Sequence, residues 1–172
     1  MAEALDPAVP DDVERLAREV LAAACRRDLR LATAESCTGG LLASLLTDLP
    51  GLSHVFDSGF VTSSDAAKIA MLDVPETLIA THGAVSEAVA VAMAEGALAR
   101  SGAHLAVAVT GYADKGPGPA GLVHFACTFR DAPARHRKEC FGAVGRAEVR
   151  LAAMRVGLRL MRDSLETLSR AP

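Results

Sequence analysis

The sequence predicts an α/β protein, a three-layer α/β/α sandwich built around a mixed sheet. Short apolar runs of strand length alternate with longer segments whose apolar residues recur at helical spacing. Leu105–Val109 is continuously apolar, as expected for a strand that helices cover on both faces. Two strand-like segments follow it directly, over 121–129 and 136–141. Because consecutive strands without a crossover helix pair antiparallel, these late strands favour a mixed sheet.

The first part of the chain is predicted to alternate helix and strand. Apolar residues at helical spacing predict a helix that begins at the acidic pair Asp11–Asp12, which can cap it, and closes near Arg26–Asp28. The apolar run 29–34 predicts the first strand. Residues 40–49 predict a buried helix that stops at the Pro50–Gly51 turn.

The middle of the chain is predicted to hold one strand and three helices. Residues 55–62 predict the strand, and Ser64 is expected to cap a short helix through Met71. A second short helix is expected over 75–81. Apolar periodicity predicts an amphipathic helix over 86–100.

The last part combines a loop, the two late strands and a long helix. A loop rich in glycine and proline is expected over 110–120, and an apolar stripe from Arg146 to about Leu168 predicts the final helix. With 172 residues and no repeat or linker, the chain is expected to form one domain over 11–170, after a disordered leader over 1–10.

Composition narrows the classes of function. The net charge of -3, the 3% aromatic content and the lack of tryptophan argue against a nucleic-acid partner. No apolar run reaches the roughly 18 residues of a membrane span, and the N-terminus lacks a basic secretory start, so a cytoplasmic location without membrane contact is expected. The four cysteines lack C-x-x-C spacing, which favours free thiols and predicts no metal site.

The segment Thr33–Gly40 is the most informative stretch of the chain. It passes from a strand through small hydroxyl residues and two glycines into an apolar helix, which predicts free backbone N–H groups that attract anions. A plain strand-to-helix turn is the alternative interpretation. Because ligands gather at the carboxyl ends of strands in open α/β sheets, Thr110–Gly111 and Arg146 are expected nearby, with Arg146 facing a phosphate.

Ser53 and Lys68 are one candidate pair for nucleophilic catalysis, in which a desolvated amine removes the hydroxyl proton. A turn serine and a surface lysine would explain the same two residues. Cys37 paired with a histidine is the competing nucleophile, and the five histidines are scattered without metal-ligand spacing.

Several multi-residue motifs occur in order along nearly the whole chain. They are Thr33–Gly40, Phe56–Thr62, His82–Glu87, Met93–Leu98, Ala106–Gly111 and Gly121–Phe125. Together they resemble the C-terminal domain of the competence/damage-inducible protein CinA, a domain that also occurs alone as a nicotinamide-nucleotide amidohydrolase (NMN deamidase).

The resemblance implies an α/β/α sandwich, no cofactor and no metal. It also implies hydrolysis of the carboxamide of NMN to nicotinic acid mononucleotide and ammonia. The family's nucleophilic serine falls on Ser53 and its lysine base on Lys68. The expected substrate-binding residues are hydroxyls, glycines and one arginine: Ser36, Thr38, Gly39, Gly40, Thr110, Gly111 and Arg146.

Three departures from the family pattern cluster around the expected pocket. Ser63 stands where the family usually has a tyrosine, and the loop 112–120 is shorter and carries the bulky Tyr112. Val144–Gly145 precedes Arg146 where the family tends to have Gly-Asp. The alternative to an amidohydrolase is therefore a catalytically weak or inactive nucleotide-binding or regulatory module. Both readings imply a pyridine nucleotide as ligand, and the apolar helix stripes fit a homodimer or the core alike.

Overall fold

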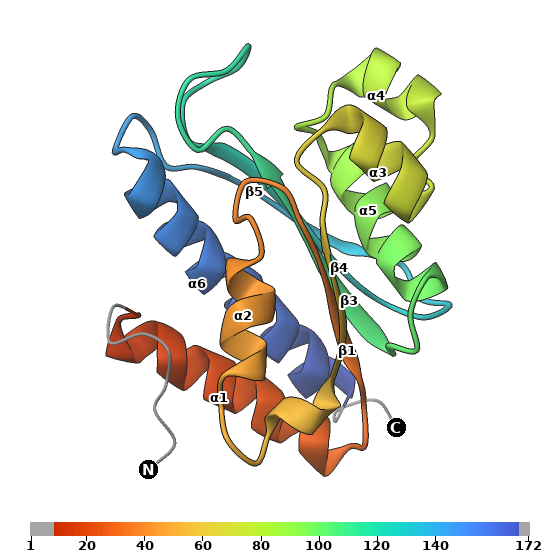
Figure 1. Ribbon diagram of the computed structural model, residues 1–172, viewed down its shortest axis with the longest axis vertical. Helices are drawn as coiled ribbons and strands as arrows, with labels where there is room; N and C mark the ends of the chain where they lie inside the picture. The colour runs from red at the N-terminus through yellow and green to blue at the C-terminus, as the bar shows by residue number, and fades with distance from the viewer. Residues whose placement is uncertain (1–8, 169–172) are drawn as a thin grey trace.

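A five-stranded sheet lies between two layers of helices in the computed structural model, which describes residues 9–168 (Figure 1). The strands are β1 (Leu31–Glu35), β2 (Phe56–Val61), β3 (Leu105–Gly111), β4 (Leu122–Phe129) and β5 (Arg135–Cys140). The helices are α1 (Asp11–Arg26), α2 (Leu41–Thr47), α3 (Asp65–Leu72), α4 (Glu76–His82), α5 (Glu87–Ala99) and α6 (Arg146–Leu168), with a 3₁₀ turn η1 at Ser53–Val55. The predicted three-layer sandwich is confirmed.

The termini of the chain fall partly outside this description. Most of the leader expected over 1–10, and the end of the domain expected over 11–170, lie outside residues 9–168. No helix within the described residues is long and apolar enough to cross a membrane.

The sheet has the strand order β2-β1-β3-β4-β5. β1 pairs parallel with both β2 and β3, whereas β4 and β5 pair antiparallel, as the late consecutive strands predicted. In this register Glu35 at the end of β1 pairs with Val61 of β2 and Val109 of β3. The carboxyl ends of the three parallel strands therefore meet at one edge of the sheet.

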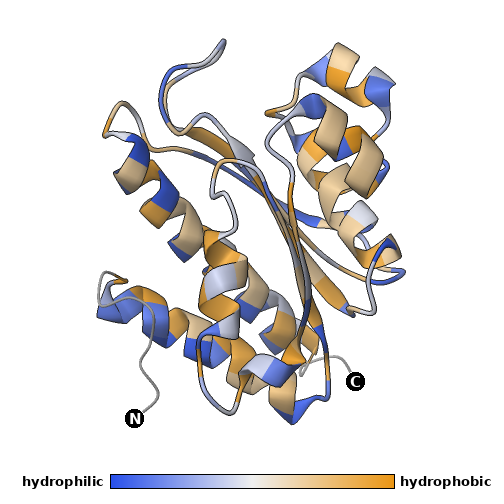
Figure 2. Ribbon diagram, in the orientation of Figure 1, coloured by the Kyte–Doolittle hydropathy of each residue, from blue (hydrophilic) through white to orange (hydrophobic). Residues whose placement is uncertain are grey.

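The two helical layers bury different side chains of the same strands. Because neighbouring strand residues point to opposite faces, Val107 and Val109 of β3 pack with α1, α2 and α6, whereas Ala106 and Ala108 face α5. α1 and α6 carry hydrophilic and hydrophobic residues in alternation, as expected for helices with one face on a core (Figure 2). The small alanines let α5 lie close against the sheet.

Close packing between α3 and α5 fixes the position of α3. A Cβ at Gly96 of α5 would overlap the carbonyl group of Leu72, so a side chain at this position would push the two helices apart. α3 begins as predicted, with the Ser64 hydroxyl accepting a hydrogen bond from the Ala67 N–H at 3.1 Å. This capped and tightly packed helix carries Lys68.

The capping of α1 differs from the sequence expectation, although the helix begins at Asp11 as predicted. Pro10 is the N-cap residue and no side chain caps the helix, while Asp11 and Asp12 lie in its first turn. The carboxylate of Asp12 instead accepts hydrogen bonds from Arg155 of α6, the shortest at 2.6 Å. This ion pair lowers the pKa of Asp12 and ties α1 to α6.

Candidate active site

Lys68 is buried at the carboxyl edge of the sheet, with 1% of its surface exposed. Its Nζ donates hydrogen bonds to the Ser36 hydroxyl at 3.2 Å and to the Thr62 carbonyl at 3.0 Å. Burial lowers the pKa of Lys68, while Asp65 and Cys37 act in the opposite direction. Because a lowered pKa increases the fraction of neutral amine, Lys68 is suited to take a proton from the neighbouring hydroxyl.

Ser36 is held beside this amine by the end of β1. Its backbone N–H donates to the Val109 carbonyl at 2.9 Å, which extends the pairing of β1 with β3 by one residue. The hydroxyl is thus placed by two neighbouring strands instead of by a free loop. Such a fixed hydroxyl next to a desolvated amine can act as a nucleophile.

The expected pairing of Ser53 with Lys68 is not found. Ser53 lies in η1, ahead of the first residue of β2, whereas Lys68 lies in α3, after the last residue of that strand. The six residues of β2 at about 3.3 Å each separate the two positions by roughly 20 Å. Lys68 therefore meets Ser36, the serine that follows the neighbouring strand.

Glu35 lies within the segment that the sequence singled out, but its own role was not predicted. Its side chain is fully buried, and its carboxylate accepts hydrogen bonds from the N–H groups of Leu42 and Ala43, at 2.9 and 3.0 Å. It also accepts a hydrogen bond from the Thr33 hydroxyl at 3.2 Å. The N–H groups expected to be free at the start of α2 are thus occupied. An acidic residue at the end of an apolar strand, ahead of a helix, was the available signal.

The loop after Ser36 keeps other donors. The Gly39 and Leu41 N–H groups donate to the carbonyls of Ser36 and Thr38. Within residues 9–168, the N–H groups of Cys37 and Thr38 have no hydrogen-bond acceptor. They lie next to the Ser36 hydroxyl in the chain, where donors can stabilise an oxyanion.

A polar cavity of about 390 Å³ opens beside Ser36. Six of the sequence-predicted residues line it: Ser36, Gly39, Ser63, Gly111, Tyr112 and Arg146. Cys37, Ala113, Asp114, Lys115 and Arg150 complete the lining. The cavity thus brings together the ends of β1 and β3 and the start of α6.

Three other predicted residues lie near this cavity without lining it. Thr38 is buried, and its hydroxyl has no partner among the described residues. The Thr110 hydroxyl donates to the Ala84 carbonyl at 2.9 Å, so it fastens the segment before α5 to the sheet. Gly40 has φ +95° and precedes α2, where its left-handed conformation turns the chain into the helix.

Tyr112 lies over its own loop. Its ring contacts the backbone at Gly116 and Gly118, where an added Cβ would overlap the ring. The Tyr112 N–H donates a hydrogen bond to the Leu122 carbonyl, and the Tyr112 carbonyl accepts one from the Gly121 N–H. These two bonds close the loop onto the start of β4. Tyr112 thus lines the cavity from a loop that its own ring holds in place.

α6 contributes two arginines one helical turn apart. Arg146 is exposed and is the first residue of the helix, and its predicted contact with a phosphate stays a prediction. Arg150 was not anticipated, although its i, i+4 spacing from Arg146 was visible in the sequence. Its Nη2 donates to the Thr38 carbonyl at 3.1 Å, and its buried Nε has no partner in the described part of the chain.

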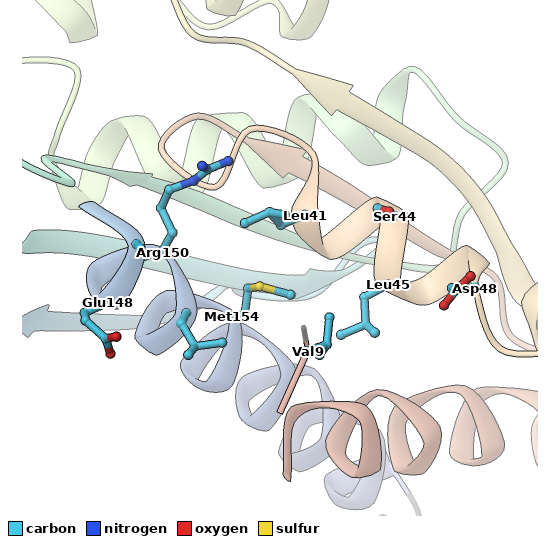
Figure 3. A pocket seen from close by; sticks show the side chains of 10 residues that line it. Val9, Leu41, Ser44, Leu45, Asp48, Glu148, Arg150 and Met154 are labelled. Carbon is cyan, nitrogen blue, oxygen red and sulfur yellow. The ribbon is translucent and has the colours of Figure 1, made fainter. Parts of the chain in front are cut away.

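Arg150 also borders a second, mainly apolar cavity of about 310 Å³ between α2 and α6. Figure 3 shows the guanidinium reaching from α6 toward the loop before α2, with Leu41, Leu45 and Met154 below it. Arg150 therefore separates the polar cavity from the apolar one.

Cys37 does not form the alternative cysteine–histidine nucleophile. Burial raises the pKa of the Cys37 thiol to about 11, which keeps it protonated near neutral pH. No histidine lies within hydrogen-bonding distance of it among residues 9–168. The same residues hold no group of three or more side chains that could bind a metal ion.

Known proteins resemble the chain over most of its length. The sequence profile of the CinA C-terminal domain matches residues 13–165. A CinA-like protein of Akkermansia muciniphila is 52% identical over 124 residues, 70% of this chain and 30% of that protein. A CinA-like protein of Mycobacterium sp. (strain MCS) is 48% identical over 141 residues, 79% of this chain and 33% of that protein. The chain spans about a third of the length of these curated relatives.

Solved structures share the fold as well as the sequence. The competence/damage inducible protein CihA from Agrobacterium tumefaciens superposes with a TM-score of 0.88 and 45% identity, over 94% of this chain and 99% of that one. A competence-damaged protein (CinA) superfamily protein from Escherichia coli has a TM-score of 0.82 and 35% identity, over 92% and 94% of the two chains. The profile and the solved structures match nearly all of the described residues, and the two sequence relatives match 70% and 79% of the chain, so this chain belongs to the CinA C-terminal domain family.

Proposed function

We propose that the protein hydrolyses the carboxamide of a pyridine nucleotide such as NMN, giving nicotinic acid mononucleotide and ammonia, with Ser36 as nucleophile and Lys68 as base. The observation that carries this proposal is the 3.2 Å contact between the Ser36 hydroxyl and the buried Lys68 amine, beside a polar cavity. The family resemblance supplies the substrate class, and the geometry replaces Ser53 with Ser36.

The reaction begins with a proton transfer. Neutral Lys68 takes the hydroxyl proton of Ser36, and Oγ attacks the carboxamide carbon. The N–H groups of Cys37 and Thr38 donate to the resulting oxyanion. Lys68 returns the proton to the amide nitrogen, the C–N bond breaks and ammonia leaves. Water then cleaves the acyl-enzyme, with Lys68 again as base.

The charged residues of the cavity suit the phosphate of the nucleotide. Arg146 is exposed at the start of α6, where its guanidinium and the helix terminus both favour an anion. Arg150 and Lys115 line the same cavity together with Asp114, so the charges on its lining are mainly positive. These charges favour an amide substrate that also carries a phosphate over an uncharged amide.

Two serine variants test the proposal. We expect Ser36→Ala to lower kcat/KM for ammonia release from NMN by about 10³-fold or more, as loss of a nucleophile does. Ser53→Ala is the matched control and should stay within about twofold of the wild type, because it removes a hydroxyl far from the cavity. Equal losses in both variants, or no ammonia from the wild type between pH 6 and 10, would refute it.

A binding module without turnover is the second candidate function. Ser63 and the Tyr112 loop, which depart from the family pattern, both line the cavity. This function predicts that NMN raises the melting temperature of the wild type and of Ser36→Ala equally while no ammonia forms. The same thermal measurement, run beside the ammonia assay, separates the two candidates.

A further inference from the structure

A second pair of nucleophile and base lies at the opposite edge of the sheet from Lys68. Cys25 is near the end of α1, and His54 is in η1, just ahead of β2. Their Sγ and Nε2 atoms are 3.7 Å apart, within hydrogen-bonding distance for sulfur. Cys25 is partly exposed and His54 is exposed, so small molecules in solution can reach both.

The other three cysteines lack this combination of access and base. Burial raises the pKa of Cys127 to about 12 and that of Cys37 to about 11, which leaves both thiols protonated. Cys140 is exposed, but its thiol donates to the Ala120 carbonyl at 3.8 Å, an acceptor that cannot take the proton. Cys25 is thus the cysteine among the described residues that has both exposure and an adjacent imidazole.

We propose that Cys25 is a thiol-modification site that reacts with low-molecular-weight disulfides of the glutathione type, with His54 as the proton acceptor. In the tautomer protonated at Nδ1, His54 offers the lone pair of Nε2 to the thiol proton. The exposed Arg26, next in the chain, supplies positive charge suited to the carboxylates of such a disulfide.

The exchange balances without another reactant. The Cys25 proton moves to His54 Nε2, and Sγ forms a bond to one sulfur of the incoming disulfide as that disulfide's own S–S bond breaks. The departing thiolate takes the proton from His54. Cys25 ends as a mixed disulfide, the second half of the reagent ends as a free thiol, and the small disulfide is the oxidant.

This chemistry is independent of amide hydrolysis. The full lengths of β1, with five residues, and of β2, with six, lie between the Cys25–His54 pair and the Ser36–Lys68 pair. A mixed disulfide on Cys25 displaces His54 from its 3.7 Å contact, so we expect it to loosen the packing of η1 on α1.

Reaction of the native protein with oxidised glutathione tests the site. We expect peptide mapping to find the first adduct on Cys25, and Cys25→Ser to remove it while ammonia release from NMN is unchanged. His54→Gln should slow the adduct formation by about tenfold, less than the roughly 10²–10⁴ of a buried general base because water reaches the pair. His82→Gln, which changes an exposed histidine at the end of α4, is the matched control.

Two results would overturn the proposal. One is an adduct that forms first on Cys140 in the native protein. The other is a His54→Gln variant that reacts as fast as His82→Gln. If His54→Gln fails to fold, the relative alkylation rates of Cys25 and Cys140 in the wild type, measured from pH 6 to 8.5, decide the matter, and a faster Cys140 refutes it.

Discussion

The two edges of the sheet hold similar pairs of side chains in different surroundings. At the carboxyl edge, the Ser36 hydroxyl contacts an amine that is 1% exposed. At the amino edge, the Cys25 thiol contacts an exposed imidazole. In each pair a weak nucleophile has a base within reach, so the residue types alone do not distinguish them.

The difference shows what each base requires from the fold. An amine is protonated in water at neutral pH, so Lys68 needs burial to lower its pKa before it can accept a proton. A neutral imidazole carries a lone pair on one ring nitrogen and can accept a proton without being buried. The buried edge, with its polar cavity, therefore suits a specific reaction on a bound substrate. The exposed edge suits reaction with small molecules that collide from solution.

Lys68→Met is expected to have the largest effect on activity, and the effect should be confined to the carboxyl edge. Removing the base should lower kcat/KM for NMN by about 10³-fold or more, while the rate of Cys25 with oxidised glutathione stays unchanged. In the wild type, kcat/KM should rise with pH until Lys68 has lost its proton. Because burial lowers the pKa of Lys68, this rise should end below the ordinary lysine value of 10.5.

Steady-state ammonia release across pH 6 to 10 measures this profile, and Lys138→Met, at an exposed position of β5, is the control. A Lys68→Met variant that retains both the activity and the pH profile of the wild type would contradict the assignment of the base.

A smaller effect, on stability, is expected from Glu35→Ala. The change leaves the Leu42 and Ala43 N–H groups and the Thr33 hydroxyl without their acceptor. Each buried donor that water does not reach then lowers the stability of the fold by about 1–3 kcal/mol. We expect the free energy of unfolding in urea to fall by about 3 kcal/mol.

Glu35→Gln keeps an acceptor oxygen and should lose less than half as much. The carboxylate holds the start of α2 next to the loop that carries Ser36, whereas the Cys25–His54 pair does not contact it. An unfolding free energy within 0.5 kcal/mol or so of the wild type for Glu35→Ala would show that the carboxylate is dispensable.

The smallest of the expected effects comes from Arg146→Ala. If this exposed cation binds the phosphate as proposed, its loss should raise KM for NMN by about tenfold and leave kcat nearly unchanged. The same variant should hydrolyse nicotinamide riboside, which has no phosphate, as the wild type does. A fall in kcat with unchanged KM would instead place Arg146 in the chemical step. Arg159→Ala, farther along α6, is the control.

Much of the fold was predictable because its signals are local. The continuous apolar run of β3, the Ser64 cap of α3 and the apolar periodicity of α1 each depend on residues a few positions apart, whereas α5 is apolar nearly all round instead of amphipathic. The observed bounds agree with the predicted ones within a few residues. α1 also begins at Asp11 as predicted, but its cap differs, since Asp12 makes an ion pair with Arg155, 143 positions away, instead of capping the helix.

The candidate site was predictable in its parts and not in its pairing. The sequence singled out Thr33–Gly40, Lys68 and Arg146, and all three regions meet around the cavity or its wall. It paired Lys68 with Ser53 because the two residues lie near each other in the chain and match a known catalytic combination. The sequence pattern does not show that β2 separates Ser53, which precedes the strand, from Lys68, which follows it, so that the two residues lie at opposite ends of the strand.

The sequence by itself determined the elements, their faces and the family, because backbone propensity and side-chain periodicity act over short stretches of chain. Tertiary structure decided which hydroxyl the buried amine meets and which N–H groups stay free. Ser36 and Lys68 are 32 positions apart, and their contact depends on the parallel pairing of β1 with β2. The buried Glu35 takes the N–H groups of α2 because folding withdraws water from its carboxylate, and buried acceptors must find donors within the protein.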